Sequence, residues 1–308
     1  AFVRCVVDQA TIMPERFQGS IFMTPAIENA VAALMPATQS VSSENLTFAT
    51  SADASLRVMK AVDNPDLSMD GLARIVTAEP LLSAKVMRMA NSVALNPMGQ
   101  TITDLKQAVI RVGVAPIRSL AMALTLDQLR HSQRMTGCRQ LANRLWERSV
   151  HVAALSFVVA RRMTRLPADE AMLAGIVHDL GRFYLLGIAA DEHPELLREQ
   201  RTLIAALDEL EPLVGRKVLE ALGLPESTVE AVVGRRNFGG SLPPQSLSDV
   251  LFLACWLAPS ANPFENAEVR EQARAQESAA LGLDRQTIAD FVAASGDEIY
   301  SIALALEA

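Results

Sequence analysis

Apolar residues recur at helical spacing along most of this chain. Between Pro80 and Ser92, for example, Leu82, Val86 and Met89 stand at i, i+4 and i+7, which places them on one side of a helix. Pro80 suits the first turn of that helix, because a proline has no N–H group to leave unpaired there. The pattern therefore predicts an amphipathic helix whose apolar stripe faces a core.

The same spacing predicts helices over nearly the whole chain. One helix is bounded by Thr103 as its N-cap and by Gly113 after its end, and another starts at Pro167 and continues through the run AMLAGIVHDLGRFYLL. Further helices are expected at 21–34, 116–129, 141–163, 195–210, 214–222, 225–233, 246–257, 267–281, 285–294 and 297–306. The only strand expected is Phe2–Val7, so the predicted fold class is all-α.

Polar residues between His131 and Gln140 interrupt the helical pattern and favour a boundary there. A Ser/Thr-rich stretch from Pro36 to Ser51 is typical of a linker. We therefore expect a two-lobed helical bundle. Its parts would be an N-terminal helix and linker at 1–51, a first helical lobe at 52–130, and a second helical lobe with C-terminal helices at 139–308.

Composition narrows the classes of function. The net charge is −7, which disfavours a broad nucleic-acid-binding surface. Three widely spaced cysteines, Cys5, Cys138 and Cys255, form neither a disulfide framework nor a metal-binding pair. No apolar run reaches ~18 residues, so we expect a cytoplasmic chain without a membrane segment. No phosphate-binding loop, nucleophile elbow or paired-cysteine motif is present, and no cofactor is expected.

Four stretches, in order, resemble the HDOD domain, an all-helical output module of bacterial signalling proteins. They read NPDLSMDGLARIVTAEPLLSAKVMRMANSVA, TITDLKQAVIRVGVAPIRSLAMAL, LWERSVHVAALSFVVARR and AMLAGIVHDLGRFYLL, and the likeness covers about 55–257. Its most specific elements are Asn91-Ser92, the helix that ends at Gly113, and the Gly-x-x-His-Asp-x-Gly run from Gly175 to Gly181.

This resemblance implies kinship to the HD phosphohydrolases, whose helical site holds divalent metal ions with several His and Asp residues. His178 and Asp179 match the pair that names that superfamily. Other ligand positions carry substitutions, namely Arg148, Glu211, Arg235, Arg236 and Cys255 (with Asp249 a turn or more away from the last). A guanidinium offers only donors and cannot ligate a metal, so the resemblance implies a degenerate HD-type second lobe whose metal centre is largely dismantled.

Three interpretations of these residues stay open. In the first, the relic pair His178–Asp179 is structural, and Arg148 with Arg235 or Arg236 neutralises Asp179 and Glu211 as ion pairs. In the second, Arg148, Arg235 and Arg236 form an anion pocket that holds a nucleotide without hydrolysing it. In the third, His151 replaces the lost first ligand and binds a metal with His178 and Asp179.

The expected function depends on which of these three interpretations holds. We expect a non-catalytic signal-transduction module that acts through an unidentified partner protein or a small ligand such as a nucleotide, with neither a nucleic acid nor a membrane as partner. The alternatives are a divalent-metal HD-type phosphohydrolase acting on a nucleotide, and a non-hydrolysing nucleotide sensor. Local readings are structural: Asn91 is expected to cap its helix, and Gly175 and Gly181 to mark close helix packing or, for Gly181, a helix end.

Overall fold

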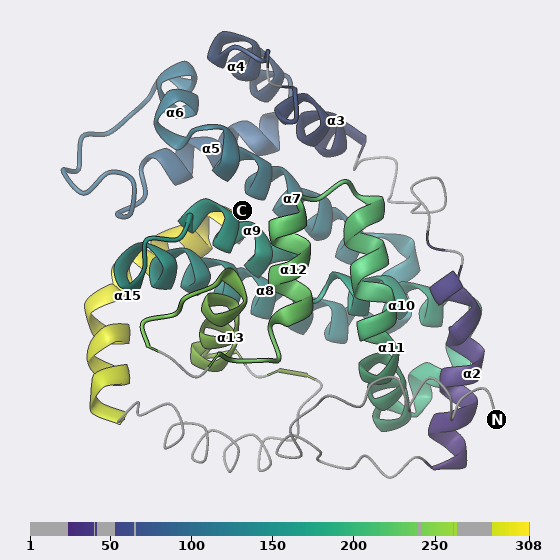
Figure 1. Ribbon diagram of the computed structural model, residues 1–308. Helices are drawn as coiled ribbons and strands as arrows, with labels where there is room; N and C mark the ends of the chain where they lie inside the picture. The colour runs from purple at the N-terminus through teal and green to yellow at the C-terminus, as the bar shows by residue number, and fades with distance from the viewer. Residues whose placement is uncertain are drawn as a thin grey trace.

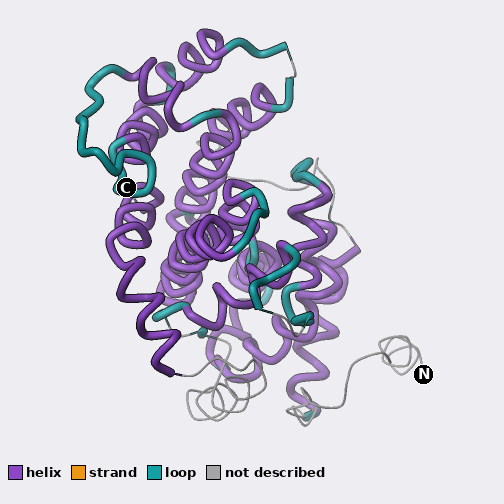
Figure 2. The backbone as a smooth tube through the Cα atoms, turned by 60° about the vertical axis from the view of Figure 1, so that its left-hand side comes forward, coloured by secondary structure: helices purple, strands orange, loops and turns teal. Residues whose placement is uncertain are grey.

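Helices make up all the regular structure that the computed structural model describes. The described residues are 24–39, 41, 53–64, 66–239, 242–260, 262–263 and 285–307. Figure 2 shows only helices and loops along this part of the chain, which confirms the all-α fold class. The expected strand Phe2–Val7 and the expected helix at 267–281 lie outside the described residues.

The helices form two lobes that meet along α7 (Val114–His131). The first lobe, at the top of Figure 1, combines α7 with α3 (Asp53–Val62), α4 (Met69–Thr77), α5 (Pro80–Ala90) and α6 (Leu105–Val112). The second lobe comprises α8 (Arg139–Met163), α9 (Ala168–Val177), α10 (Leu180–Glu192), α11 (Gln200–Ala221), α12 (Glu226–Gly234) and α13 (Leu247–Leu257). Because α7 packs against α3 and α5 on one side and α8 and α9 on the other, both lobes share one continuous core.

Two further helices and two short 3-10 segments complete the described chain. The helix α2 (Pro25–Gln39) packs against α11, and α15 (Arg285–Glu307) packs against α8 and α5. The 3-10 helices η2 (Gln133–Cys138) and η3 (Pro194–Arg198) link α7 to α8 and α10 to α11. The segment with the predicted boundary thus contains η2, and the division at 1–51, 52–130 and 139–308 stays a prediction.

Glycine makes the corner between α6 and α7. Gly113 has a φ of 80°, a left-handed conformation that a side chain would strain, and the two helices meet there at 104°. At the other end of α6 the N-cap is Asp104, not the expected Thr103: the N–H of Gln107 donates to Asp104 Oδ1 at 2.8 Å. An aspartate side chain satisfies the same orphan N–H groups, and this choice shifts the helix start by one residue.

Asn91 has both a capping and a clamping role. It is the C-cap of α5, as expected, and its side chain also pairs with both backbone groups of Ile102. The amide donates to the Ile102 carbonyl at 2.9 Å, and the Ile102 N–H donates to Asn91 Oδ1 at 2.8 Å. This bidentate contact closes the loop that leads to α6.

Close helix packing explains both glycines of the His-Asp motif. A Cβ atom on Gly175 would lie 2.5 Å from the Cα of Ala153, so α9 and α8 approach too closely for any side chain. Gly181 lies in the first turn of α10 and does not end a helix; a Cβ there would stand 2.9 Å from the Cα of Gly215 on α11. The two glycines set the spacing of the helices around the motif.

Helices are divided or joined differently from expectation in three places. The run from Pro167 is broken at His178–Asp179 into α9 and α10. The expected helices at 195–210 and 214–222 are one helix, α11, which continues through Pro212 because the turns on both sides bury apolar residues, Leu210 and Val214. The pair at 285–294 and 297–306 is likewise one helix, α15.

One described helical run is long and apolar enough to cross a membrane. It spans Ala168–Glu192, comprising α9 and α10, and 83% of its most apolar window is buried inside the fold. A core helix passes the same test of length and composition, and this run packs against α7, α8 and α11.

Candidate functional site

The break between α9 and α10 turns His178 and Asp179 into the interior of the second lobe. The two residues are 2% and 1% exposed. The Nδ1–H group of His178 donates to the Gly175 carbonyl at 2.7 Å, since a carbonyl only accepts. Its Nε2 atom lies 3.1 Å from Asp179 Oδ2. The imidazole is therefore fixed in place by its own helix and faces the carboxylate beside it.

Asp179 belongs to a closed circuit in which three acids alternate with three arginines. We call this circuit the charge ring. Its members are, in order, Asp179, Arg182, Asp208, Arg236, Glu211 and Arg235. Asp179 and Arg182 come from the start of α10, the two other acids from α11, and the two other arginines from the end of α12. Each guanidinium contacts two carboxylates. Because the ring has three groups of each sign, its formal charges balance.

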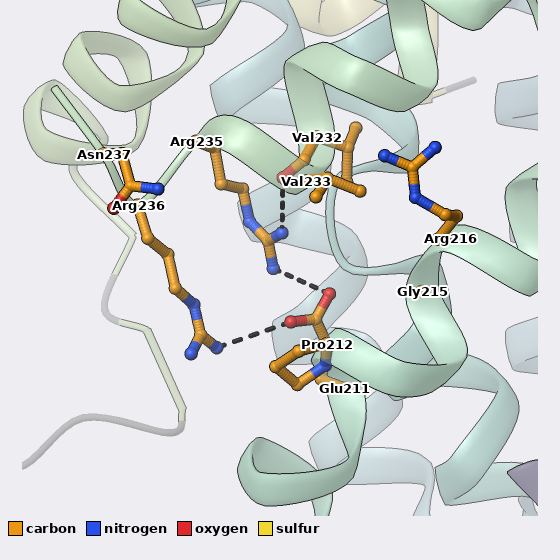
Figure 3. Close-up of a pocket in the computed structure, with 9 residues that line it drawn as sticks. All are labelled: Glu211, Pro212, Gly215, Arg216, Val232, Val233, Arg235, Arg236 and Asn237. Atoms are coloured by element: carbon orange, nitrogen blue, oxygen red, sulfur yellow. Dashed lines mark hydrogen bonds and ion pairs between the residues drawn. The ribbon is translucent and has the colours of Figure 1, made fainter. Parts of the chain in front are cut away.

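Arg182 and Arg235 connect Asp179 to the two other acids of the ring. Arg182 donates to Asp179 and to Asp208, and Arg235 lies 2.9 Å from Glu211 Oε1 and 4.0 Å from Asp179 Oδ1. Arg236 completes the circuit, at 2.9 Å from Asp208 Oδ1 and 3.4 Å from Glu211 Oε2 (Figure 3 shows Glu211 between Arg235 and Arg236).

Four side chains of the ring are buried and two reach solvent. The side chains of Asp179, Glu211, Arg182 and Arg235 are at most 8% exposed, whereas those of Asp208 and Arg236 are 32% and 38% exposed. The ring thus extends from the core beside His178 to the surface.

The ring favours the ionised forms of Asp179 and Asp208. Burial by itself raises the pKa of the Asp179 carboxyl, but His178, Arg182 and Arg235 outweigh burial and hold that pKa well below its usual value. Burial opposes ionisation of Asp208 too, and Arg182 and Arg236 again lower its pKa. For the Arg182 guanidinium, the three acids of the ring overcome burial and raise the pKa. The charges of Asp179, Arg182 and Asp208 are therefore maintained by their neighbours.

The fold and the motif around this ring match a known family. The sequence profile of the HDOD domain matches residues 48–237, more than half of the chain. This chain belongs to the HDOD family. No curated protein matches the chain.

Solved structures share the fold of this HDOD chain. A candidate metal-dependent phosphohydrolase from Shewanella amazonensis SB2B is 22% identical, with a TM-score of 0.72 over 92% of this chain and 100% of that one. An HDOD domain protein of unknown function from Geobacter sulfurreducens is 18% identical, with a TM-score of 0.56 over 91% and 98%. A candidate signal transduction protein from Marinobacter aquaeolei VT8 is 21% identical, with a TM-score of 0.55 over 92% and 66%. At these identities the likeness concerns the fold alone.

Arg148 lies apart from the ring. It is 4% exposed, and it donates to the carbonyls of Cys255 at 3.1 Å and Ser260 at 3.0 Å. These carbonyls lie at and beyond the C-terminal end of α13, where a cation also complements the helix dipole. The expectation that Arg148 neutralises Asp179 or Glu211 is therefore wrong, because its guanidinium caps α13 instead. For the same reason the three arginines of the expected anion pocket do not come together.

Asp249 is equally committed to local structure. Its carboxylate accepts hydrogen bonds from the N–H groups of Gly239 at 2.7 Å and Ser246 at 3.1 Å, and from the Ser246 hydroxyl at 2.8 Å. With Ser246 it forms a capping box at the start of α13. Cys255, on the same helix, is half-buried. Asp249 thus caps its own helix, and the carbonyl of Cys255 accepts a hydrogen bond from Arg148.

His151 is on α8, three residues after Arg148. Its Nδ1 atom is buried and finds no hydrogen-bond partner among the described residues. No group of three or more His, Cys, Asp or Glu residues in the described ranges is arranged to hold a metal ion. The interpretation in which His151 joins His178 and Asp179 as a metal ligand thus gains no support from the geometry.

The donor set of the ring does not fit the divalent metal centre that kinship to HD phosphohydrolases implies. Such a centre needs roughly three or more imidazoles or carboxylates that turn lone pairs to one point. Here Arg182, Arg235 and Arg236 stand among the carboxylates, and a guanidinium offers N–H groups only. Asp179 Oδ1, Asp208 Oδ1 and both oxygens of Glu211 lie against those N–H groups, and Asp179 Oδ2 lies beside His178.

Arg182 and Asp208 were not anticipated from the sequence. Their spacing along the sequence could have identified them. On predicted helices, Arg182 lies three residues after Asp179, and Asp208 lies three residues before Glu211. Side chains at i and i+3 share a helix face, so each would have been expected to join its neighbour at the same site.

A small hollow of ≈ 100 Å³ opens beside the ring, lined by Glu211, Pro212, Gly215, Arg216, Val232, Val233, Arg235, Arg236 and Asn237 (Figure 3). Arg216 contributes little positive potential to it, because its guanidinium is within 3.4 Å of three acids, Glu220, Glu226 and Glu230. All three arginines around the hollow are therefore paired with carboxylates.

Proposed function

We propose that this HDOD chain is a non-catalytic regulatory module of bacterial signalling that acts in the cytoplasm by binding a partner protein. The charge ring is the observation that supports this proposal. It fills the region of the His-Asp motif with matched charges, and both of the buried acids that could serve a metal, Asp179 and Glu211, face guanidinium groups. The net charge of −7 favours a protein partner over a nucleic acid.

The alternative is a divalent-metal phosphohydrolase acting on a nucleotide, the activity suggested by the description of the Shewanella protein. It would require three arginines to leave the acids and a new imidazole to arrive. Removing one partner from a buried ion pair costs about 3–5 kcal/mol. The binding free energy of the metal ion would have to exceed this cost for each buried pair that it breaks.

Metal analysis and hydrolysis assays on one preparation test the proposal. The full chain is purified without chelator, its content of Mn, Fe, Mg and Zn is measured, and it is incubated with those ions and a panel of nucleotides that includes cyclic dinucleotides. We expect substoichiometric metal and no turnover. Stoichiometric metal together with turnover that is lost in Asp179→Asn would overturn the proposal.

A second arm addresses the nucleotide sensor. Calorimetric titration of the same nucleotides should give no heat, because Arg235 and Arg236 are already engaged by Glu211 and Asp208. Saturable heat that disappears in Arg236→Met, while the unrelated surface variant Arg57→Met keeps it, would favour the sensor. A pull-down from bacterial lysate that retains a specific protein with wild type is the positive result we expect.

A further inference from the structure

The last turn of α15 lies across the junction of the two lobes. The helix packs against α8 of the second lobe and against α5 and α7 of the first. Ile302, Ala303, Ala305 and Leu306 in its final turns are at most 7% exposed. Figure 1 shows α15 in yellow, leading to the C-terminus beside these helices. The helix lies outside residues 48–237, the range that the family profile matches.

A lysine is buried beneath this last turn. Lys85 on α5 is 1% exposed, and its Nζ atom donates to the Leu306 carbonyl at 2.6 Å. The carbonyls of a last helical turn have no partner within their helix, so the hydrogen bond satisfies one of them. Burial of an ammonium nevertheless carries a large desolvation cost, which one neutral acceptor repays only in part.

Charged groups around Lys85 come from three helices. Arg88 lies on α5 itself, Asp127 and Arg130 on α7, and Glu307 on α15. On α4 and α6, which also pack against α5, Asp70 and Lys106 pair with each other at the surface. Burial is the largest influence and lowers the pKa of Lys85 to about 8, Asp127 opposes it, and the two arginines add to it.

The middle of α15 is held differently. Arg162 on α8 donates to both oxygens of Glu298, at 2.9 and 3.2 Å, where both side chains reach the surface. The contacts of α15 with the second lobe thus include a solvent-accessible ion pair. Its contacts with the first lobe include the hydrogen bond from the buried ammonium of Lys85.

We propose that α15 is a reversible strap between the lobes, whose last turn detaches readily from α5 because docking it buries the ammonium of Lys85. When the turn detaches, Lys85 regains solvent, and the faces of α5 and α7 that pack against α15 lose their cover. The strap gives the module two states, and it stands whether or not the charge ring is non-catalytic.

Proton linkage gives the proposal a measurable sign. The pKa of Lys85 is about 8 when the turn is docked and returns towards its ordinary 10.5 when the turn is detached. The detached state then binds the proton more tightly, so docking strengthens as pH rises through this interval. Between pH 6.5 and 9.0 the docking constant is expected to rise about tenfold.

Hydrogen exchange of the full chain measures this constant. Rapid-pulse exchange at pH 6.5, 7.5 and 9.0, corrected for the intrinsic exchange rate, gives protection factors for the amides of 302–307 and, as an internal reference, for buried amides of α8. We expect the protection of 302–307 to rise about tenfold relative to the α8 amides. Protection that is flat or falls with pH would overturn the proposal.

Two variants attribute the change to Lys85. Lys85→Met keeps the length of the side chain without the charge and should abolish the pH dependence, whereas Lys60→Met removes an exposed lysine from α3 and should keep it. If Lys85→Met does not fold, Ile302→Ala serves instead: it should lower protection at every pH and preserve the tenfold rise. A Lys85→Met protein with the wild-type pH dependence would also overturn the proposal.

Discussion

The guanidinium of Arg235 lies 2.9 Å from the carboxylate of Glu211, and both residues occupy positions where the HD superfamily is expected to place metal ligands. The two residues that the family resemblance aligns with ligand positions thus form a pair of opposite charges. The expectation of an ion pair there agrees with the geometry, although Arg148, the third arginine in that expectation, binds backbone carbonyls elsewhere.

Removing Arg182 should destabilise the protein strongly. In Arg182→Met the Asp179 carboxylate, 1% exposed, keeps only His178 and the more distant Arg235, and a buried charge that loses its partner costs about 3–5 kcal/mol. Urea denaturation should show that loss in the free energy of unfolding. The matched control is Arg216→Met, which removes an arginine with three partially exposed acidic partners and should cost at most about 1 kcal/mol. Equal losses in the two variants would contradict a structural role for the ring.

Acid should weaken the second lobe through the ring. The pKa values of Asp179 and Asp208 are lowered in the folded protein, so both acids contribute stability that is present above an ordinary aspartate pKa of 3.8 and is lost as pH falls below it. The free energy of unfolding, measured from pH 6 to pH 3, should therefore fall steeply at the acid end.

The variant Asp179→Asn should reduce that slope, because one of the two linked acids is gone. Asp66→Asn, in an exposed turn before α4, should leave the slope as in wild type. A slope that Asp179→Asn does not change would show that other groups govern acid denaturation.

A single methyl group should separate α10 from α11. In Gly181→Ala the new Cβ would lie 2.9 Å from the Cα of Gly215 and 3.0 Å from its nitrogen, and backbone atoms cannot rotate away. Overpacking of this kind costs about 1–3 kcal/mol, seen as a lower midpoint of thermal unfolding. In Gly296→Ala nothing lies within 4 Å of the new methyl group, and α15 should instead gain up to about 1 kcal/mol of stability. If the two variants had the same midpoint, the close approach would be of no consequence.

Arg148 should matter through geometry as well as charge. Its two nitrogens reach two carbonyls at the end of α13, so Arg148→Lys, with one ammonium, should satisfy at most one of them. We expect Arg148→Lys to recover less than half of the stability lost in Arg148→Met, measured by urea denaturation. Full recovery in the lysine variant would mean that the charge alone is important.

Periodicity and family likeness predicted much of the fold, and single residues explain where they failed. Apolar spacing locates α5, α8 and α13 within a few residues, because these helices bury one face or more in the core. The break at His178–Asp179 was missed, since an unbroken apolar run gives no sign that two residues leave the helix. Pro212 produced the opposite error, because the burial of Leu210 and Val214 overrides its effect on the helix.

The residues of the candidate site were easier to predict than the contacts between them. The family resemblance indicated His178, Asp179, Glu211, Arg235 and Arg236. The fold brings the last four into the charge ring and places His178 beside Asp179. The sequence did not reveal which group each charge contacts. Arg148 lies on α8, and only the three-dimensional course of the chain shows that the carbonyls at the end of α13 accept its hydrogen bonds.

The closed circuit also bears on how such a chain can change over generations. Each of the six charges contacts two neighbours, so replacing Arg235 by histidine would weaken the pairing of two acids at once, leaving Glu211 with Arg236 and Asp179 with Arg182. A substitution at one member of the ring therefore changes the surroundings of two others. We expect the six positions to change together in evolution rather than one at a time.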